Sequence, residues 1–222
     1  IRQFCEAIGV TRSDGVVDIA MLEHAVRDTL NDQAPRAMAV LRPLKLLITN
    51  YSGDPEQMLK APVHPNKPEL GERELPFGPE LYIDREDFSE DSTLSRKKFK
   101  RLVLGEWVRL RSAYIIRAEK VERDSAGEVV AVHATLVPGT VGADSPEGVR
   151  PRGVIHWVSA SSSGAAELRL YERLFNHEAP DRGDEDVLHH LNPDSYSVIS
   201  DCRLEPSLAS AAPEQYFQFE RE

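Results

Sequence analysis

Two runs of alternating apolar and polar residues, joined by a turn, constrain the fold of this chain more than any other feature. In residues 106–118 apolar side chains recur at every second position, as they do along a half-buried strand. Residues 124–127, Asp-Ser-Ala-Gly, favour a turn, and residues 130–136 alternate again. The pattern therefore predicts two antiparallel strands joined by this turn.

The rest of the chain contains more short β-prone runs. We expect strands at residues 40–50, 81–83, 154–158, 168–174, 196–199 and 216–221. Turn residues separate these runs, and no internal repeat is present. Many short strands with turns between them favour β-barrels over alternating strands and helices.

Helices are predicted only near the N-terminus. A short helix is expected at residues 2–8, ending at Gly9, and a second at residues 18–30 with Asp18 as its N-cap. Pro35 restricts the residue before it, so the second helix must end by then. The apolar residues of this helix fall on one face: Ile19, Leu22, Val26 and Leu30.

Composition excludes several classes of protein. No apolar run approaches the ~18 residues of a membrane-spanning helix, and no signal-peptide pattern opens the chain, so we expect neither membrane insertion nor secretion. Cys5 and Cys202 cannot form a disulfide framework, which favours a reducing cytosol. The chain begins without methionine and stops within a strand-like run, so we expect a fragment of a longer protein.

Charge is distributed unevenly along the sequence. The formal net charge is −10, which by itself disfavours a nucleic-acid partner. Residues 95–123, however, contain ten basic and only three acidic side chains. Such a cationic segment within an acidic chain indicates a binding site for a polyanion, although a solvated charged face remains the alternative.

Within this segment, Arg109 and Arg111 are two positions apart on an expected strand and leave the same face. Their Cα atoms would then lie roughly 6.6 Å apart, comparable to the phosphate spacing of a single strand, and guanidinium groups suit both phosphate and guanine edges. Phe99 and Tyr114 provide aromatic surfaces on which an unstacked base could lie. No recognition helix for duplex DNA is evident, so the residues favour single-stranded RNA.

Other chemistry is scarce. No phosphate-binding glycine loop and no Cys-x-x-Cys pair is present. His189 and His190 are adjacent and would point apart, and the acidic residues 84–91 lack EF-hand spacing and are better read as a surface loop. Trp107 and Trp157 both lie in strand patterns and are assigned to packing. We therefore expect neither a metal site nor catalytic residues.

Several sequence blocks resemble one family. They are residues 34–40 (APRAMAV), 100–105 (KRLVLG) with 108–111 (VRLR), 153–160 (GVIHWVSA), 169–175 (RLYERLF) and 217–221 (FQFER). In these blocks the chain resembles the bacterial glutaminyl-tRNA synthetases, which are class I aminoacyl-tRNA synthetases. The blocks follow the family's order over essentially the whole chain.

The resemblance implies a mainly β, C-terminal portion of such an enzyme, truncated at both ends. Residues 1–35 would be a helical connector from the catalytic half. Residues 36–92 and 161–222 would form a proximal anticodon-binding β-barrel, and residues 93–160 a distal barrel inserted into it, both like ribosomal protein L25.

The resemblance also implies which residues contact the anticodon. Arg36, Gln218 and Arg221 match positions that read the central U, and Arg101 matches the arginine that reads the third-position G. Arg109 and Arg111, with Lys100 beside them, match residues around the first position. Lys98 belongs to the same group, although the best-known members have glutamine there, and Phe99 stands where tyrosine is usual. The loop that would touch the anticodon arm comprises Arg12, Ser13, Asp14, Gly15, Val16, Val17, Asp18 and Ile19.

For the full-length protein, the resemblance implies a glutamine–tRNA ligase that uses ATP with Mg²⁺. This chain lacks the family's Rossmann core, so we expect it to hold no cofactor and to be inactive alone. Its expected partner is the anticodon stem-loop of tRNA(Gln), with no DNA and no membrane, and we expect a cytoplasmic monomer. Two alternatives remain: the same region of an archaeal- or eukaryote-type glutamyl-tRNA synthetase, and a β-barrel interaction module without an RNA role.

Overall fold

The computed structural model describes residues 1–9, 12, 15–53, 56–182 and 184–220. Two α-helices, α1 (Arg2–Ile8) and α2 (Ile19–Gln33), precede a chain that is otherwise built from strands. The strands are β1 (Arg36–Ala37), β2 (Ala39–Val40), β3 (Pro43–Ile48), β4 (Gln57–Pro62), β5 (Glu72–Phe77), β6 (Glu80–Asp84), β7 (Phe88–Ser89), β8 (Leu102–Val103), β9 (Trp107–Leu110), β10 (Ile115–Arg123), β11 (Val129–Val137), β12 (Val154–Ile155), β13 (Val158–Ser159), β14 (Gly164–Tyr171), β15 (Tyr196–Leu204) and β16 (Gln218–Phe219). Four short 3-10 helices are η1 (Pro68–Leu70), η2 (Arg85–Asp87), η3 (Val187–His190) and η4 (Pro206–Ser210). The mainly β fold class is confirmed.

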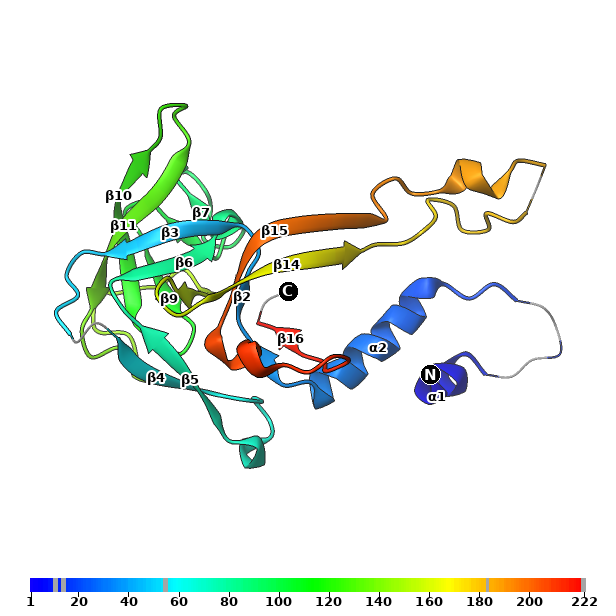
Figure 1. The fold of residues 1–222 in the computed structure, drawn as a ribbon, viewed down its shortest axis with the longest axis horizontal. Coiled ribbons are helices and arrows are strands. Elements are labelled where there is room, and N and C mark those ends of the chain that lie inside the picture. The colour runs from blue at the N-terminus through cyan, green and yellow to red at the C-terminus, as the bar shows by residue number, and fades with distance from the viewer. Residues whose placement is uncertain (10–11, 13–14, 54–55, 183, 221–222) are drawn as a thin grey trace.

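A seven-stranded sheet forms the body of the molecule (Figure 1). Its strand order is β12-β9-β10-β11-β3-β6-β13, and the sheet curls so that its inner face encloses a core, with the β4–β5 hairpin beside it. The strands β3 and β6 belong to the range predicted as the proximal barrel, whereas β9 to β12 belong to the predicted distal range. The predicted boundary at residue 93 therefore lies between strands that share one sheet.

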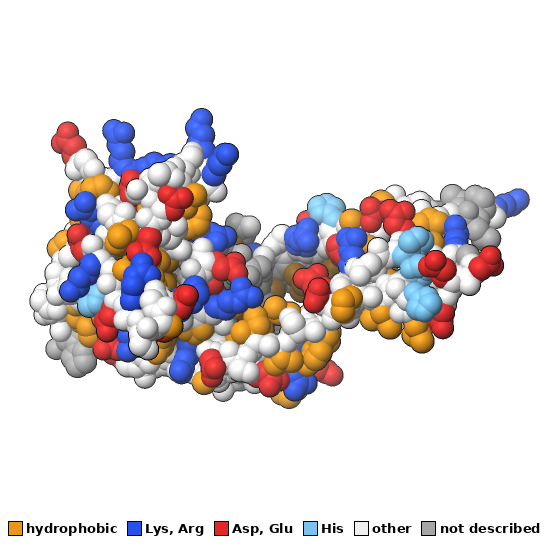
Figure 2. Space-filling model, turned by 90° about the horizontal axis from the view of Figure 1, so that it is seen from above, with side chains coloured by type: hydrophobic (Ala, Val, Ile, Leu, Met, Phe, Trp, Pro, Cys, Tyr) orange, Lys and Arg blue, Asp and Glu red, His pale blue; other side chains and the backbone are white. Residues whose placement is uncertain are grey.

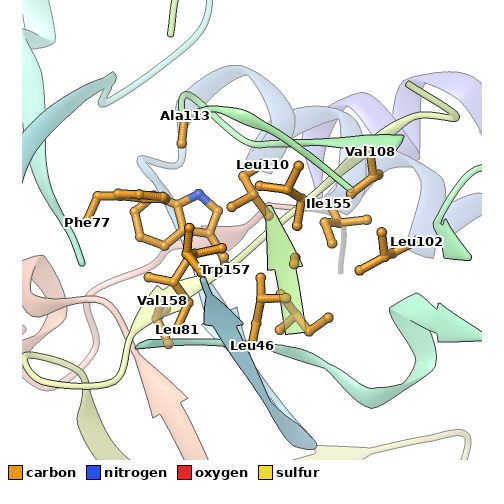
Figure 3. Close-up of a cluster of buried hydrophobic side chains, with 14 of the residues drawn as sticks. Leu46, Phe77, Leu81, Leu102, Val108, Leu110, Ala113, Ile155, Trp157 and Val158 are labelled. Atoms are coloured by element: carbon orange, nitrogen blue, oxygen red, sulfur yellow. The ribbon is translucent and has the colours of Figure 1, made fainter. Parts of the chain in front are cut away.

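Large apolar side chains fill this core (Figure 3). Trp157 is 1% exposed and packs edge-on against Phe77, with ring centroids 5.3 Å apart. Its indole Nε1 donates a hydrogen bond of 2.9 Å to the Arg111 carbonyl, which satisfies the one polar atom of the side chain. The packing role predicted for Trp157 is confirmed, while Trp107 is half-buried beneath the guanidinium group of Arg117.

The strand expected over residues 106–118 is two strands. β9 ends at Leu110, and β10 returns antiparallel to it with Ile115 opposite Arg109. Ser112 has φ 55°, in the left-handed region, and the Ala113 amide donates to the Leu110 carbonyl at 2.9 Å, so the chain reverses there. Alternation continues on both sides of the reversal, and periodicity alone therefore did not reveal it. The second hairpin, β10–β11 around Asp124 and Gly127, is confirmed.

A second region lies beside the body. It contains the sheet β14-β15-β2 and the two-stranded sheet β1-β16. The β14–β15 ribbon extends far from the core (Figure 1).

Helix α2 begins as predicted, because the Asp18 carboxylate accepts from the Ala20 amide at 2.9 Å. Its predicted apolar face is largely uncovered in the described structure, with Ile19 47% and Val26 46% exposed. No helix in the described part of the chain is both long and apolar enough to cross a membrane.

Candidate nucleic-acid interface

The cationic residues 94–101 form an irregular segment that lies across residues 150–153. Arg152, which is buried, donates a hydrogen bond to the Leu94 carbonyl, and Arg96 donates to the Arg150 carbonyl at 2.8 Å. These two contacts hold the start of the segment, residues 94–96, against residues 150–152. The side chains of Lys98 and Lys100 remain exposed, and no ion pair in the described structure involves either of them.

Gly153 determines how closely the segment approaches the sheet. A Cβ atom at this position would lie 2.2 Å from the Lys100 carbonyl oxygen and 3.1 Å from its carbonyl carbon. Both are backbone atoms, which cannot swing aside as a flexible side chain can. Gly153 is required here because only a residue without a side chain permits this contact.

Arg101 is positioned by the end of β6 and the η2 turn that follows. Its Nη1 donates to the Glu86 carbonyl at 2.7 Å, and its Nε lies 3.5 Å from Oδ1 of Asp87. The guanidinium carbon also lies 5.7 Å from the centre of the Phe99 ring. These contacts use part of the guanidinium group, and the side chain remains 35% exposed.

Asp87 is a site residue that sequence reasoning missed. It was included in an acidic surface loop, but Asp84 and Asp87 are buried, and that interpretation is wrong for both. Asp84 accepts hydrogen bonds from the Leu41 and Arg42 amides, whereas Asp87 faces Arg101 on one side and His156 Nδ1, at 3.5 Å, on the other. Burial lowers the pKa of His156, so this imidazole is neutral at physiological pH. No local signal distinguishes these carboxylates from their exposed neighbours.

Arg109 and Arg111 do not act as a matched pair. Arg109 donates to the Thr140 carbonyl at 2.6 Å and to the Ala143 carbonyl at 2.8 Å, and both of these contacts hold the loop after β11. Arg111 lies past the end of β9, and its Nε is 3.1 Å from Oε2 of Glu220. The two side chains were predicted to leave one face of a continuous strand. In the structure Arg109 instead contacts the loop after β11, and Arg111 contacts the carboxylate of Glu220.

A second group of predicted residues lies where β1 and β16 pair in parallel, with Arg36 opposite Gln218. Arg36 donates to the carbonyls of Ala34 and Asn31, each at 2.8 Å, and Gln218 Nε2 donates to Asn31 Oδ1 at 2.7 Å. The Oε1 atom of Gln218 is buried and has no hydrogen-bond partner among the described residues. This unused acceptor is suited to a donor from outside the chain. Arg221 lies outside the described residues.

The predicted arm-contact loop precedes α2. Arg12 and Gly15 are exposed, as are Val16, Val17 and the N-cap Asp18, and Ile19 starts the helix. Ser13 and Asp14 lie outside the described residues. An exposed valine, 64% in the case of Val16, indicates a surface available for contact.

Three histidines, His177, His189 and His190, lie in the connection between β14 and β15. His190 in η3 stacks on His177 with ring centroids 4.8 Å apart. Figure 2 shows histidine side chains on the extended arm among acidic and hydrophobic side chains, and one on the body, where many of the Lys and Arg side chains lie. Within the described ranges, no group of three or more His, Cys, Asp or Glu residues could hold a metal ion.

Comparisons with known proteins show the family to which this chain is related. Two family models, both described as tRNA synthetases class I (E and Q), anti-codon binding domain, match residues 34–137 and 154–222. The chain is 51% identical over 223 residues to a glutamine–tRNA ligase of Haemophilus influenzae, and 50% identical over 224 residues to one of Pseudomonas syringae pv. tomato. A glutamine–tRNA ligase of Shigella boydii is 49% identical over 222 residues.

Each of these alignments covers 100% of this chain but only 38–39% of the relative. The chain thus spans about two fifths of the length of the curated relatives it matches. Its cationic segment and its β1–β16 pairing both fall within the matched ranges. The chain therefore belongs to the family of anticodon-binding domains of the class I tRNA synthetases for glutamate and glutamine.

Proposed function

We propose that this chain is the anticodon-recognition region of a glutaminyl-tRNA synthetase and binds the anticodon stem-loop of tRNA(Gln). The observation that carries the proposal is the 51% identity to a glutamine–tRNA ligase along the whole chain. The whole protein would attach glutamine to tRNA(Gln) with ATP and Mg²⁺ bound in a catalytic half, and this chain alone would be inactive. We place the protein in the cytoplasm as a monomer.

The surface supports single-stranded RNA as the ligand. Lys98 and Lys100 present exposed ammonium groups, and Arg101 presents a partly exposed guanidinium group beside the Phe99 ring. Cations attract the phosphates, while a planar donor and an aromatic ring suit unstacked bases. At the second group, the vacant Gln218 Oε1 can accept from the imino or amino group of a base.

We propose a division of labour among these residues that follows the family resemblance. Arg36, Gln218 and Arg221 read the central base, Arg101 reads the third, and Lys98, Lys100 and Arg111 contact the RNA around the first. Arg109 already donates to two carbonyls, so it acts mainly by shaping the loop after β11. The segment from Arg12 to Ile19 contacts the anticodon arm.

We also propose a division into a helical connector and two β units. The seven-stranded sheet unites β3 and β6 with β9 to β13, so the distal unit would extend from about residue 42 to residue 160. The proximal unit would comprise β1, β2 and β14 to β16. Strands that exchange backbone hydrogen bonds across one sheet fold together, which favours this border over one at residue 93.

Titration of the chain with the anticodon stem-loop of tRNA(Gln) tests the proposal. Binding should weaken steeply with salt: for about four phosphate contacts, log K should fall with log[salt] with a slope of about −3. Fluorescence anisotropy at several salt concentrations would measure the slope. Binding no tighter than to an unrelated acidic polymer would contradict an RNA role, and tighter binding to a tRNA(Glu) loop would favour the glutamate enzyme.

Replacing Arg101 by alanine should reduce discrimination at one anticodon base by about 1–3 kcal/mol, because a guanidinium group that reads a base edge makes two directed hydrogen bonds. The measurement is the affinity ratio between stem-loops that differ only at that base. Arg123→Ala is the matched control, since it removes an exposed arginine at the end of β10, outside residues 94–101, that is paired with Glu90. An equal loss of affinity for all stem-loops would show that Arg101 contacts only phosphate.

A further inference from the structure

A buried arginine connects parts of the chain that are far apart in sequence. Arg73 on β5 is 6% exposed, and its Nε lies 2.8 Å from Oε1 of Glu205, which is 2% exposed. Its Nη1 donates to the Pro62 carbonyl, and its Nη2 donates to Oε1 of Glu220 at 2.9 Å. Two of the guanidinium nitrogens therefore donate hydrogen bonds to protein oxygens, and the third lies next to a carboxylate oxygen.

Glu205 explains why the arginine is buried here. Its Oε2 accepts from the Met38 amide at 2.8 Å, next to β1. Burial raises the pKa of Glu205, and the positive charge of Arg73 opposes this rise. A buried carboxylate requires a positively charged partner. Glu205 therefore holds Arg73 in the interior, where Arg73 is engaged by the protein and is not an RNA contact.

Glu220 is the member of this network that reaches the RNA-binding residues. Its second oxygen, Oε2, lies 3.1 Å from Nε of Arg111, while Oε1 is bound to Arg73. Its backbone amide donates to the Ala37 carbonyl at 2.8 Å, and it lies just past the end of β16, two residues after Gln218. Glu220 is thus linked to the β1–β16 pair through its backbone, and to Arg73 and Arg111 through its carboxylate.

We propose that Arg73 is a positioning residue for RNA recognition, and that through Glu220 it couples readout at the Arg36–Gln218 pair to contact at Arg111. This inference rests on the proposed function. Arg73 holds one carboxylate oxygen of Glu220 and leaves the other facing Arg111, so the position of Glu220 sets the orientation of Arg111. A wrong base at Gln218 would displace β16 and therefore change the orientation of Arg111, whereas the correct base leaves that orientation unchanged.

A thermodynamic cycle tests this coupling with the 222-residue chain. The affinity for a tRNA(Gln) stem-loop is measured with the correct and with a substituted central base, in the wild type and in Arg111→Ala. We expect the penalty for the wrong base to be at least about five-fold larger when Arg111 is present, within the range of coupling between interacting sites. In the Glu220→Gln background this ratio should fall to about one, because glutamine replaces one of the two acceptor oxygens by an NH2 donor and removes the negative charge that attracts both guanidinium groups.

Arg73→Gln should abolish the coupling in the same way. Since Arg73 is buried and this variant can fail to fold, Glu220→Gln is the decisive variant, its side chain being 14% exposed. Lys60→Gln is the control, because it removes an exposed ion pair with Glu72 next to the same hairpin position. A purely structural role for the network would lower affinity for both stem-loops equally and leave the ratio unchanged.

The outcomes separate this inference from the proposed function. Coupling that is present in the wild type and in Lys60→Gln, but lost in Glu220→Gln, supports the inference. Base-dependent binding without coupling in the wild type, or coupling that persists in Glu220→Gln, overturns it and leaves the proposed function intact. An absence of base-dependent binding in the wild type overturns both.

Discussion

Replacing Gly153 by alanine is expected to lower the free energy of unfolding by about 1–3 kcal/mol, the usual cost of forcing extra atoms into a packed site. The new Cβ would lie 2.2 Å from the Lys100 carbonyl oxygen, so residues 94–101 must move away from the sheet. Arg101 would then lose its position against Glu86 and Asp87, and RNA binding should weaken together with stability.

Urea denaturation and a stem-loop titration of the same variant would measure both effects. Gly164→Ala is the matched control, because a Cβ at Gly164 meets no atom within 4 Å and the residue has no positive φ. We expect this control to behave like the wild type in both measurements. Unchanged stability and RNA affinity in Gly153→Ala would show that the cationic segment tolerates displacement.

Replacing Trp157 by alanine should have the largest effect on stability, a loss of about 3–5 kcal/mol. The side chain is 1% exposed and contacts Phe77, and its removal also leaves the Arg111 carbonyl without the indole donor. Against a typical total stability of about 5–15 kcal/mol, such a loss removes a large share of the stability of the fold.

Trp107→Ala is the control for this change, because Trp107 is half-buried and contacts the Arg117 guanidinium group on the outer side of the sheet. Thermal and urea unfolding, followed by circular dichroism, should show a clearly smaller loss for Trp107→Ala. Equal losses for the two variants would contradict the assignment of Trp157 to the centre of the core (Figure 3).

Sequence patterns predicted those features of the fold that depend on neighbouring residues. The Asp18 cap and the β10–β11 hairpin each arise within a few positions, where capping and alternation act directly. The reversal at Ser112 was missed because its flanking strands keep the same alternation on both sides. The extent of the sheet was also missed, since pairing of β11 with β3 joins residues far apart in the chain.

The residues of the candidate site also differ in whether the sequence alone could identify them. Charge counting identified the segment with Lys98, Lys100 and Arg101, because an excess of basic over acidic residues within a short window is visible in the sequence. Asp87 and Arg73 were not identified, because an acidic residue in an acidic run and a single arginine look the same whether buried or exposed. Only their partners distinguish them.

By itself, the sequence determined that this chain is mainly β, that its positive charge is concentrated in residues 95–123, and that it resembles one family. Tertiary structure decided which cations remain available to RNA and which are engaged by the protein. Arg73 and Glu220 are 147 positions apart, and their contact exists only once the β-strands between them have folded. Local pattern specifies elements and charge, whereas burial and long-range pairing depend on the packing of those elements, which no short window of residues contains.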